Sequence, residues 1–352
     1  MKRLWLVVLF LIALLVTGCR TAPQTPEGPR VLRVMTYSSF DMSEEVIAAF
    51  TGAHNAEIQF LDAGDTGQML NQAILSKANP QADVIYGLDN TFLSRALDAE
   101  LFVPYAAKGL ENVPDALKTG LDNLVTPVDY GDVCLNVDLA YFETHELAVP
   151  QSLDDLIQPA YKGLLVVQNP ASSSPGLAFL ITTIGAYGDD AFVDYWEALR
   201  ANDVLVVEDW DTAYWGEFSG GAFSEGQYPL VVSYATSPAA EVYFSEGALE
   251  TPPTGAMVTP GTCFRQVEYA AILQNNQNQD LAEAFLDFVL EDAFQSAIPL
   301  HMWVFPASQN AELPQVFADF AVEAESPIAV DAVQIESQRE RWIEMWTQTV
   351  LR

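Results

Sequence analysis

The chain has 352 residues, half of them hydrophobic, with 15 lysine and arginine residues against 48 aspartate and glutamate residues, for a formal net charge of −33. This charge excludes nucleic-acid backbones and anionic membrane surfaces as expected partners; it favours a cationic ligand, although a large net charge also keeps any protein soluble. The length and apolar content provide for a large core in two domains or lobes.

Residues 1–18 have the pattern of a bacterial lipoprotein signal peptide. A basic start precedes an apolar run over residues 4–16, which is too short for a comfortable transmembrane span. The run ends in Val-Thr-Gly-Cys, which resembles a lipobox, so we expect Cys19 to be lipidated; an ordinary cleaved signal peptide with a chance cysteine is the alternative. Residues 19–30 form a Pro-rich spacer. The protein is predicted to be exported and lipid-anchored, in the periplasm or on the outer face.

Strand-like and helix-like segments alternate after the spacer. Residues 31–40 predict a strand and residues 43–54 a helix with Ser43 as its N-cap. Two further units have strands over 56–64 and 82–90 and helices over 66–79 and 91–102. This alternation favours a mostly parallel sheet, in which ligands bind beyond the carboxyl ends of the strands. Those ends are residues 37–40, 62–67 and 87–90.

The pattern after residue 125 predicts a second α/β lobe and two long strands by which the chain crosses between the lobes. Three serines at 172–174 precede Pro175 and an apolar run, a pattern that places hydroxyl and free N–H groups at a helix N-terminus suited to an anion such as phosphate; redundant capping is the alternative. Residues 126–139 and 264–273 predict long strands that cross between lobes, and residues 281–298 and 332–352 predict amphipathic helices.

This layout is that of a bilobal, periplasmic-binding-protein-like α/β fold, with two α/β lobes joined by hinge strands. The predicted ranges are 31–128 and 268–310 for lobe 1, 135–262 and 311–352 for lobe 2, with C-terminal helices that pack across the lobes, and 129–134 and 263–267 for the hinge. If the hinge segments run side by side, Cys134 and Cys263 lie close enough to bond, since a disulfide requires Cα atoms within about 7 Å. The three histidines lack the spacing of a metal cluster, so no metal is expected.

Aromatic residues recur at the predicted corners rather than inside the apolar runs. They are Tyr37, Trp210, Tyr214, Trp215, Tyr234 and Trp303. Taken singly, each is better explained as a core residue than as a site residue, but the position at corners favours a site. Aromatic faces attract organic cations by about 0.5–2 kcal/mol. With Asp65 and Asp89 nearby, they predict a pocket for a flat, positively charged heterocycle.

Several motifs make the resemblance to a known family specific. They are, in order, VMTYSSF, DVIYGLDN, VDYG, NPASSSPGLAFL, VVEDWDTAYWGEF, LVVSYATSPA, FQSAIP with WVFP, and RERWIEMW. Over nearly the whole chain from Val31 to Arg352, this pattern resembles the periplasmic thiamine-binding proteins, the substrate-binding components of thiamine ABC transporters among the extracellular solute-binding proteins. The chain departs from that pattern in having DMSEE where a tryptophan follows the first strand, in its hinge cysteines and in its lipobox.

The resemblance implies that the thiamine rings lie between aromatic side chains, with a carboxylate near the aminopyrimidine and serines near the phosphate-bearing end. Together with the corner residues, it gives the predicted ligand residues Tyr37, Asp65, Asp89, Asn90, Ser172, Ser173, Ser174, Trp210, Tyr214, Tyr234, Ser237 and Trp303.

The predicted function is therefore that of a monomeric binding lipoprotein. It captures thiamine, thiamine monophosphate or thiamine diphosphate and delivers it to a permease, without a cofactor. A ferric-ion or polyamine receptor of the same fold is the alternative, although the sequence has no Tyr-Tyr pair and the serine corner favours an anion. An exported hydrolase is disfavoured because no Gly-x-Ser-x-Gly motif occurs. A purely structural surface lipoprotein is a further alternative, but it would not need acidic and aromatic residues at the ends of its strands.

Overall fold

The computed structural model describes residues 28–118 and 122–352. The predictions for the signal peptide, for lipidation of Cys19 and for most of the spacer lie outside these residues. In the described part of the chain, no helix combines the length and apolar character needed to cross a membrane.

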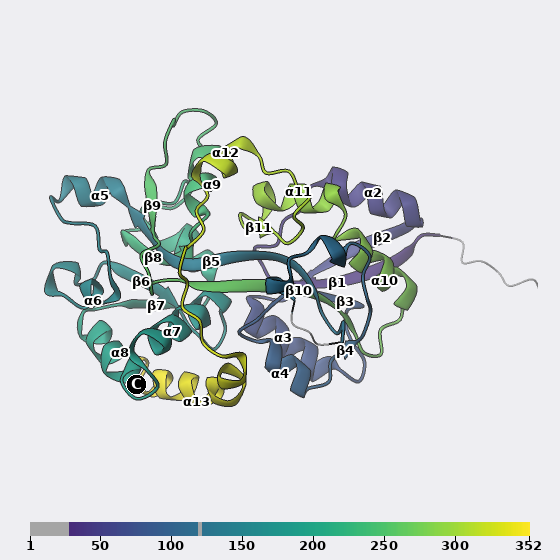
Figure 1. The fold of residues 1–352 in the computed structure, drawn as a ribbon, viewed down its shortest axis with the longest axis horizontal. Coiled ribbons are helices and arrows are strands. Elements are labelled where there is room, and N and C mark those ends of the chain that lie inside the picture. Colours follow the sequence, from purple (N-terminus) through teal and green to yellow (C-terminus); the bar gives the residue numbers. More distant parts are fainter. Residues whose placement is uncertain (1–27, 119–121) are drawn as a thin grey trace, which may run out of the picture.

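One mixed sheet runs through both lobes in the strand order β2-β1-β3-β10-β5-β8-β6-β7. Strand β4 pairs with β10, and β9 and β11 pair with β5. The pairs β1–β2, β1–β3, β6–β7 and β6–β8 are parallel, whereas every pairing of β5 and β10 is antiparallel. The prediction of a mostly parallel sheet therefore holds only at the two ends, because the crossing strands run in opposite directions. Figure 1 shows both strands passing through the middle of the molecule.

The first lobe begins with the three predicted β-α units. The Ser43 side chain accepts a hydrogen bond from the Val46 N–H, as predicted for the N-cap of the first helix. The elements are β1 Arg30–Thr36, α2 Glu44–His54, β2 Ala56–Asp62, α3 Thr66–Ser76, β3 Val84–Asp89, α4 Leu93–Asp98 and β4 Phe102–Val103, followed by short 3₁₀ helices Leu110–Asn112 and Asp115–Leu117.

The second lobe packs around an apolar helix that follows the serine corner. Helix α7 is buried along most of its length, which explains its uniformly apolar sequence. The elements here are β5 Thr126–Asp138, α5 Leu139–Thr144, α6 Leu153–Leu156, a 3₁₀ helix Pro159–Tyr161, β6 Leu165–Gln168, α7 Ser174–Tyr187, α8 Phe192–Ala201, β7 Leu205–Val207, a π-helical turn Thr212–Glu217, β8 Leu230–Tyr234, α9 Ser237–Phe244 and β9 Thr254–Met257.

The remaining elements are β10 Phe264–Leu273, α10 Gln279–Phe288, α11 Asp292–His301, β11 Phe305–Pro306, α12 Gln315–Phe320 and α13 Ala332–Val350. The single helix predicted over 281–298 is wrong, because Glu291 has extended backbone angles and separates α10 from α11. The Gln295 side chain stabilises the break by donating to the Val289 carbonyl at 2.7 Å.

The C-terminal helix α13 touches both halves of the molecule. Trp346 packs edge-on against Trp196 of α8, with ring centroids 5.6 Å apart. On the same helix, the Arg339 guanidinium donates to the Thr91 carbonyl at 3.3 Å and lies over the Phe92 ring. Figure 1 shows α13 beneath the second lobe, reached by a long segment from α12.

The crossing strands lie side by side where the hinge is expected. In the register of β5 with β10, Val133 faces Phe264 and Asp132 faces Arg265. Cys134 and Cys263 are bonded to each other, with Cα atoms 4.4 Å apart. This disulfide links β5 covalently to the residue that precedes β10.

Candidate ligand-binding site

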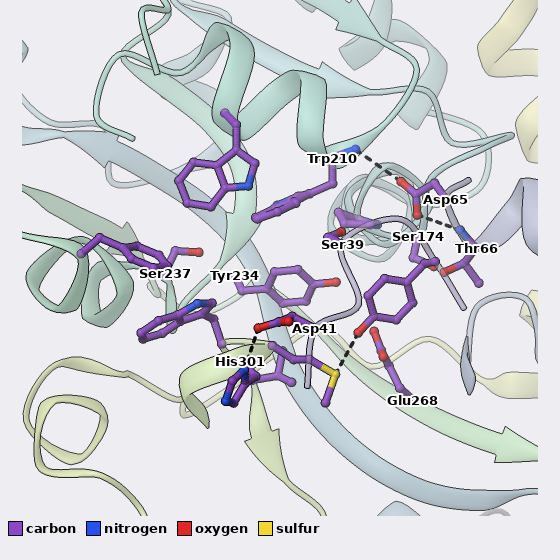
Figure 2. Close-up of a pocket in the computed structure, with 17 residues that line it drawn as sticks. Ser39, Asp41, Asp65, Thr66, Ser174, Trp210, Tyr234, Ser237, Glu268 and His301 are labelled. Carbon is purple, nitrogen blue, oxygen red and sulfur yellow. Dashed lines mark hydrogen bonds and ion pairs between the residues drawn. The ribbon is translucent and has the colours of Figure 1, made fainter. Parts of the chain in front are cut away.

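A cavity of about 240 Å³ lies between the lobes, beyond the carboxyl ends of β1, β2 and β8. Of the predicted ligand residues, those that line it are Tyr37, Asp65, Ser174, Trp210, Tyr234, Ser237 and Trp303. Figure 2 shows Asp65 and Glu268 at one end, Ser237 at the other, and the Trp210 and Tyr234 rings between them.

Tyr37 occupies its place because β3 has a glycine beside it. Gly87 has a φ angle of +90°, and a Cβ atom there would lie 2.2 Å from the Tyr37 ring. The missing side chain therefore lets the ring lie against the β3 backbone. The Tyr37 hydroxyl donates to the Met302 sulfur at 3.5 Å.

Trp210 forms one aromatic wall of the cavity, and Tyr214 and Ser233 fix its indole ring from the side away from the cavity. Its indole stacks on Tyr214, with centroids 5.0 Å apart and an interplanar angle of 13°. Its Nε1–H donates to the Ser233 hydroxyl at 3.0 Å, while the Tyr214 hydroxyl donates to Glu241 at 2.7 Å. Tyr214 itself lies behind this wall, outside the cavity lining, because the indole covers it.

Trp303 lies on the opposite side, in the loop after α11. Its backbone is in the left-handed region, with a φ of 57°, and its carbonyl accepts a hydrogen bond from the Thr236 hydroxyl. Its ring packs against Tyr243 and Phe244, each with a centroid distance of 5.3 Å. Trp210 and Trp303, which come from distant parts of the chain, thus both face the cavity.

Asp65 is both a lining residue and a helix cap. Its Oδ1 accepts the Thr66 N–H at 2.8 Å and its Oδ2 accepts the Trp210 N–H at 3.3 Å. Burial raises the pKa of Asp65 to about 6, although these hydrogen bonds oppose the shift. Beside it, the Gly67 N–H donates to the Ser172 carbonyl at 2.9 Å, so the lobes touch at this end of the cavity.

The serine corner is mostly turned away from the cavity. Ser174 lines it, but its hydroxyl donates to the buried carboxylate of Asp89. The Ser172 hydroxyl donates to the Glu208 carbonyl at 2.7 Å, and Ser173 is fully buried at the start of α7. Ser172 and Ser173 thus lie outside the lining that the anion-site prediction assumed for them.

Asp89 and Asn90 also lie outside the cavity lining, since both hold the end of β3 in place. Asp89 accepts hydrogen bonds from the Thr91 N–H and hydroxyl at 2.7 and 2.5 Å. Asn90 bonds the β10 backbone, donating to the Arg265 carbonyl at 3.1 Å and accepting the Val267 N–H at 3.2 Å.

Glu268 is a lining residue that the sequence analysis missed. It is only 5% exposed, and Gln266 joins it to the site, donating to Glu268 Oε1 at 2.9 Å and to the Tyr234 hydroxyl at 3.0 Å. The available signal was two polar residues spaced two apart in an apolar strand, which places both on one face. Other lining residues not predicted as ligand residues are Ser39, Asp41, Thr66, Pro175, Trp215, Phe244, His301, Met302 and Val304.

The charged side chains that line the cavity are predominantly acidic. The lining includes three carboxyl groups, Asp41, Asp65 and Glu268, and among the described residues that form it there is no lysine or arginine. His301 is the one basic side chain in this set, and its Nδ1 lies 2.6 Å from Asp41. The arrangement suits an aromatic cation.

Comparison with known proteins now decides the family. Residues 79–322 match the family described as bacterial extracellular solute-binding protein. The chain belongs to this family. The family predicted from the motifs is confirmed, and with it the expectation of an exported solute-binding protein.

Individual members of the family are similar over most of their length. The thiamine-binding periplasmic protein of Salmonella typhimurium is 33% identical over 92% of this chain and 94% of its own, and that of Brucella suis is 29% identical over 96% of each. A solved periplasmic thiamin binding protein superposes with a TM-score of 0.81 at 28% identity, covering 94% of this chain and 99% of its own. A ferric binding protein from Campylobacter jejuni has a TM-score of 0.69 at 15% identity, which supports the bilobal fold alone.

Proposed function

We propose that this solute-binding protein captures thiamine in the interlobe cavity and delivers it to the permease of an ABC importer, without catalysing a reaction. The observation that carries the proposal is the cavity lining, which combines aromatic side chains from distant parts of the chain with carboxyl groups. The thiamine-binding names of the most similar relatives support the same ligand.

Thiamine matches this lining in shape and charge. It joins a flat aminopyrimidine to a thiazolium ring with a permanent positive charge. Trp210 and Trp303 offer faces for such rings, and cation–π contacts strengthen when water is removed. The Asp65 carboxylate, already fixed by two backbone N–H groups, presents its remaining lone pairs to the amino group of the pyrimidine.

The same lining indicates a preference among the phosphate forms. A volume of about 240 Å³ lies below the roughly 300–1,000 Å³ of typical ligand pockets. Added phosphate groups would also meet carboxylates, and two of the three corner serines lie outside the lining. We therefore expect affinity to fall from thiamine to thiamine monophosphate and again to thiamine diphosphate.

Cys19 is proposed to carry the lipid that tethers the monomeric protein to the cell membrane. The Pro-rich spacer after it would let the lobes reach the permease. Mass spectrometry of the membrane-extracted protein tests this, since the mature N-terminus should be a diacylated Cys19.

The ligand proposal is tested by calorimetric titration of the chain from Arg30 onward, which holds every helix and strand described here. The panel is thiamine, its mono- and diphosphate, spermidine and ferric citrate. We expect submicromolar binding of thiamine, with tryptophan fluorescence quenching that is lost in Trp210→Ala, and an affinity about 100-fold lower in that variant. The control is Leu75→Ala, which truncates an exposed apolar side chain outside the cavity lining. Binding of spermidine or iron alone would refute thiamine as the ligand.

A further inference from the structure

Two buried acidic residues face each other on the crossing strands. Glu268 of β10 pairs directly with Asp129 of β5 in the antiparallel register. Glu268 is 5% exposed and Asp129 is fully buried. Like charges directly opposite each other destabilise a strand pair, so this arrangement is costly for the fold.

Each carboxyl group has only part of its hydrogen-bonding capacity filled. Asp129 Oδ2 accepts the Tyr86 hydroxyl at 3.0 Å, and Glu268 Oε1 accepts the Gln266 amide at 2.9 Å. The other oxygens, Asp129 Oδ1 and Glu268 Oε2, have no hydrogen-bond partner among the described residues. Within residues 28–118 and 122–352, neither group forms an ion pair with an arginine, lysine or histidine.

The groups that face this pair from the surrounding elements include no lysine and no arginine. They are Tyr37 after β1, Asp65 at α3, Tyr86 and Asp89 of β3, and Tyr234 of β8, with Asp41 and His301 in the same cavity lining. Burial, and then repulsion from Asp129, raises the pKa of Glu268 well above its ordinary value. Burial also raises the pKa of Asp129 to about 7. Both shifts, together with the facing carboxyl groups, favour a proton held within the pair in the ligand-free protein.

The two members of the pair differ in their access to the cavity. Glu268 lines it, whereas Asp129 does not. Figure 2 shows the Glu268 carboxyl group directed toward the other lining side chains. Gly87 lies between Glu268 and Tyr37. A Cβ atom on this glycine would be 2.2 Å from the Tyr37 ring and 3.5 Å from Glu268 Oε2. This oxygen, which has no hydrogen-bond partner by distance among the described residues, is therefore close to the Tyr37 side of the cavity. A buried carboxyl group without a cationic partner thus reaches the cavity lining beside Tyr37.

We infer that Glu268 is the counter-ion of the ligand's quaternary nitrogen, and that binding of the cation expels the proton that Glu268 and Asp129 hold in the ligand-free protein. The inference rests on the proposed thiamine function. One carboxyl O–H bond breaks, the proton bonds to water or to the buffer base, and no covalent bond forms between ligand and protein. Charge is balanced because the ligand's positive charge replaces that of the proton.

The exchange has a defined pH dependence. A nearby cation favours the ionised carboxylate, so the ligand-bound pair loses its proton at a lower pH than the ligand-free pair. Affinity for thiamine should then rise with pH through the neutral range, by up to about tenfold per pH unit, and level off above the range in which the free pair titrates.

The test measures proton release directly. Thiamine is titrated into the protein at pH 7 in phosphate and in Tris, whose different ionisation enthalpies report the protons released. We expect about 0.5–1 proton released per thiamine bound. The Glu268→Gln variant keeps the size and hydrogen bonding of the side chain; it should abolish the release and lower thiamine affinity at least tenfold at pH 8.

Two controls identify the source of the proton. Asp65→Asn should retain the release, and Glu323→Gln, which removes an exposed charge outside the cavity lining, should bind thiamine within about twofold of the wild type. Thiamine binding without release in the wild type would overturn the inference, as would release that persists in Glu268→Gln and disappears in Asp65→Asn. No thiamine binding at all would refute the proposed function itself.

Discussion

Two cross-strand pairs on β5 and β10 have opposite chemistry. Asp132 faces Arg265, and the guanidinium donates to both of its oxygens at 2.8 Å. Further along the same strands, beyond two intervening residue pairs, Asp129 faces Glu268 with no cation in contact in the described structure. Both aspartates are buried, so burial alone does not distinguish them.

The difference indicates which pair serves the fold and which serves the ligand. A buried carboxylate with an arginine and a backbone donor is satisfied within the protein, and Asp132 also accepts the Ala324 N–H at 2.7 Å. A carboxyl group opposite another carboxyl group lacks such compensation unless a proton or an external cation supplies it. Strand pairing therefore creates a site for positive charge at the cavity.

Breaking the satisfied pair should have the largest effect on stability. Arg265→Met leaves the Asp132 carboxylate buried without its cation, and we expect the free energy of unfolding to fall by about 3 kcal/mol. Urea denaturation at pH 7 measures this loss. Because Arg265 does not line the cavity, thiamine affinity should change less than threefold; a large loss of affinity with unchanged stability would contradict the division of roles.

Removing one carboxyl group from the Asp129–Glu268 pair should raise the free energy of unfolding at high pH. The pKa of Asp129 is raised in the folded state, so its stabilising contribution is complete below the unfolded pKa and is lost as pH rises through about 7. Asp129→Asn does not titrate, and we expect it to be more stable than the wild type by on the order of 2 kcal/mol at pH 8 and equally stable at pH 4. Ligand-free denaturation curves at both pH values check this; destabilisation at pH 8 would contradict it.

Asp65 provides an intermediate case, since backbone N–H groups rather than a cation satisfy it. Asp65→Ala removes the cap of α3 and should lower stability by about 1 kcal/mol. Asp65→Asn retains a capping oxygen, so stability should stay within about 0.5 kcal/mol while thiamine affinity falls about threefold. Thermal unfolding and titration of the two variants separate these roles, and equal effects of Ala and Asn on stability would argue against the cap.

Local patterns in the sequence predict the elements that surround the cavity. The cap at Ser43, the β-α alternation and the aromatic corners depend on neighbouring residues. Local patterns therefore correctly place Tyr37, Trp210 and Trp303 in connecting segments beside the cavity. The same reasoning does not give side-chain direction. Asp89 and Asn90 occupy a strand end as predicted, but they bond to Thr91 and β10.

The acidic pair could not be predicted because it depends on register between distant segments. Asp129 and Glu268 come together only when β5 and β10 align, and a shift of one residue would turn Glu268 to the other face. The interruption between α10 and α11 escaped prediction for a related reason, since a side-chain bond from Gln295 to the Val289 carbonyl stabilises it within an apolar run.

We expect the cavity to select its ligand by positive charge as well as by shape. The most direct measurement compares thiamine with its neutral isostere, in which a thiophene replaces the thiazolium ring, by titration at pH 8 into the wild type and Glu268→Gln. Selection by charge predicts that the wild type binds thiamine at least tenfold more tightly than the isostere, and that Glu268→Gln removes most of this difference. Equal affinities of the wild type for both compounds would contradict it.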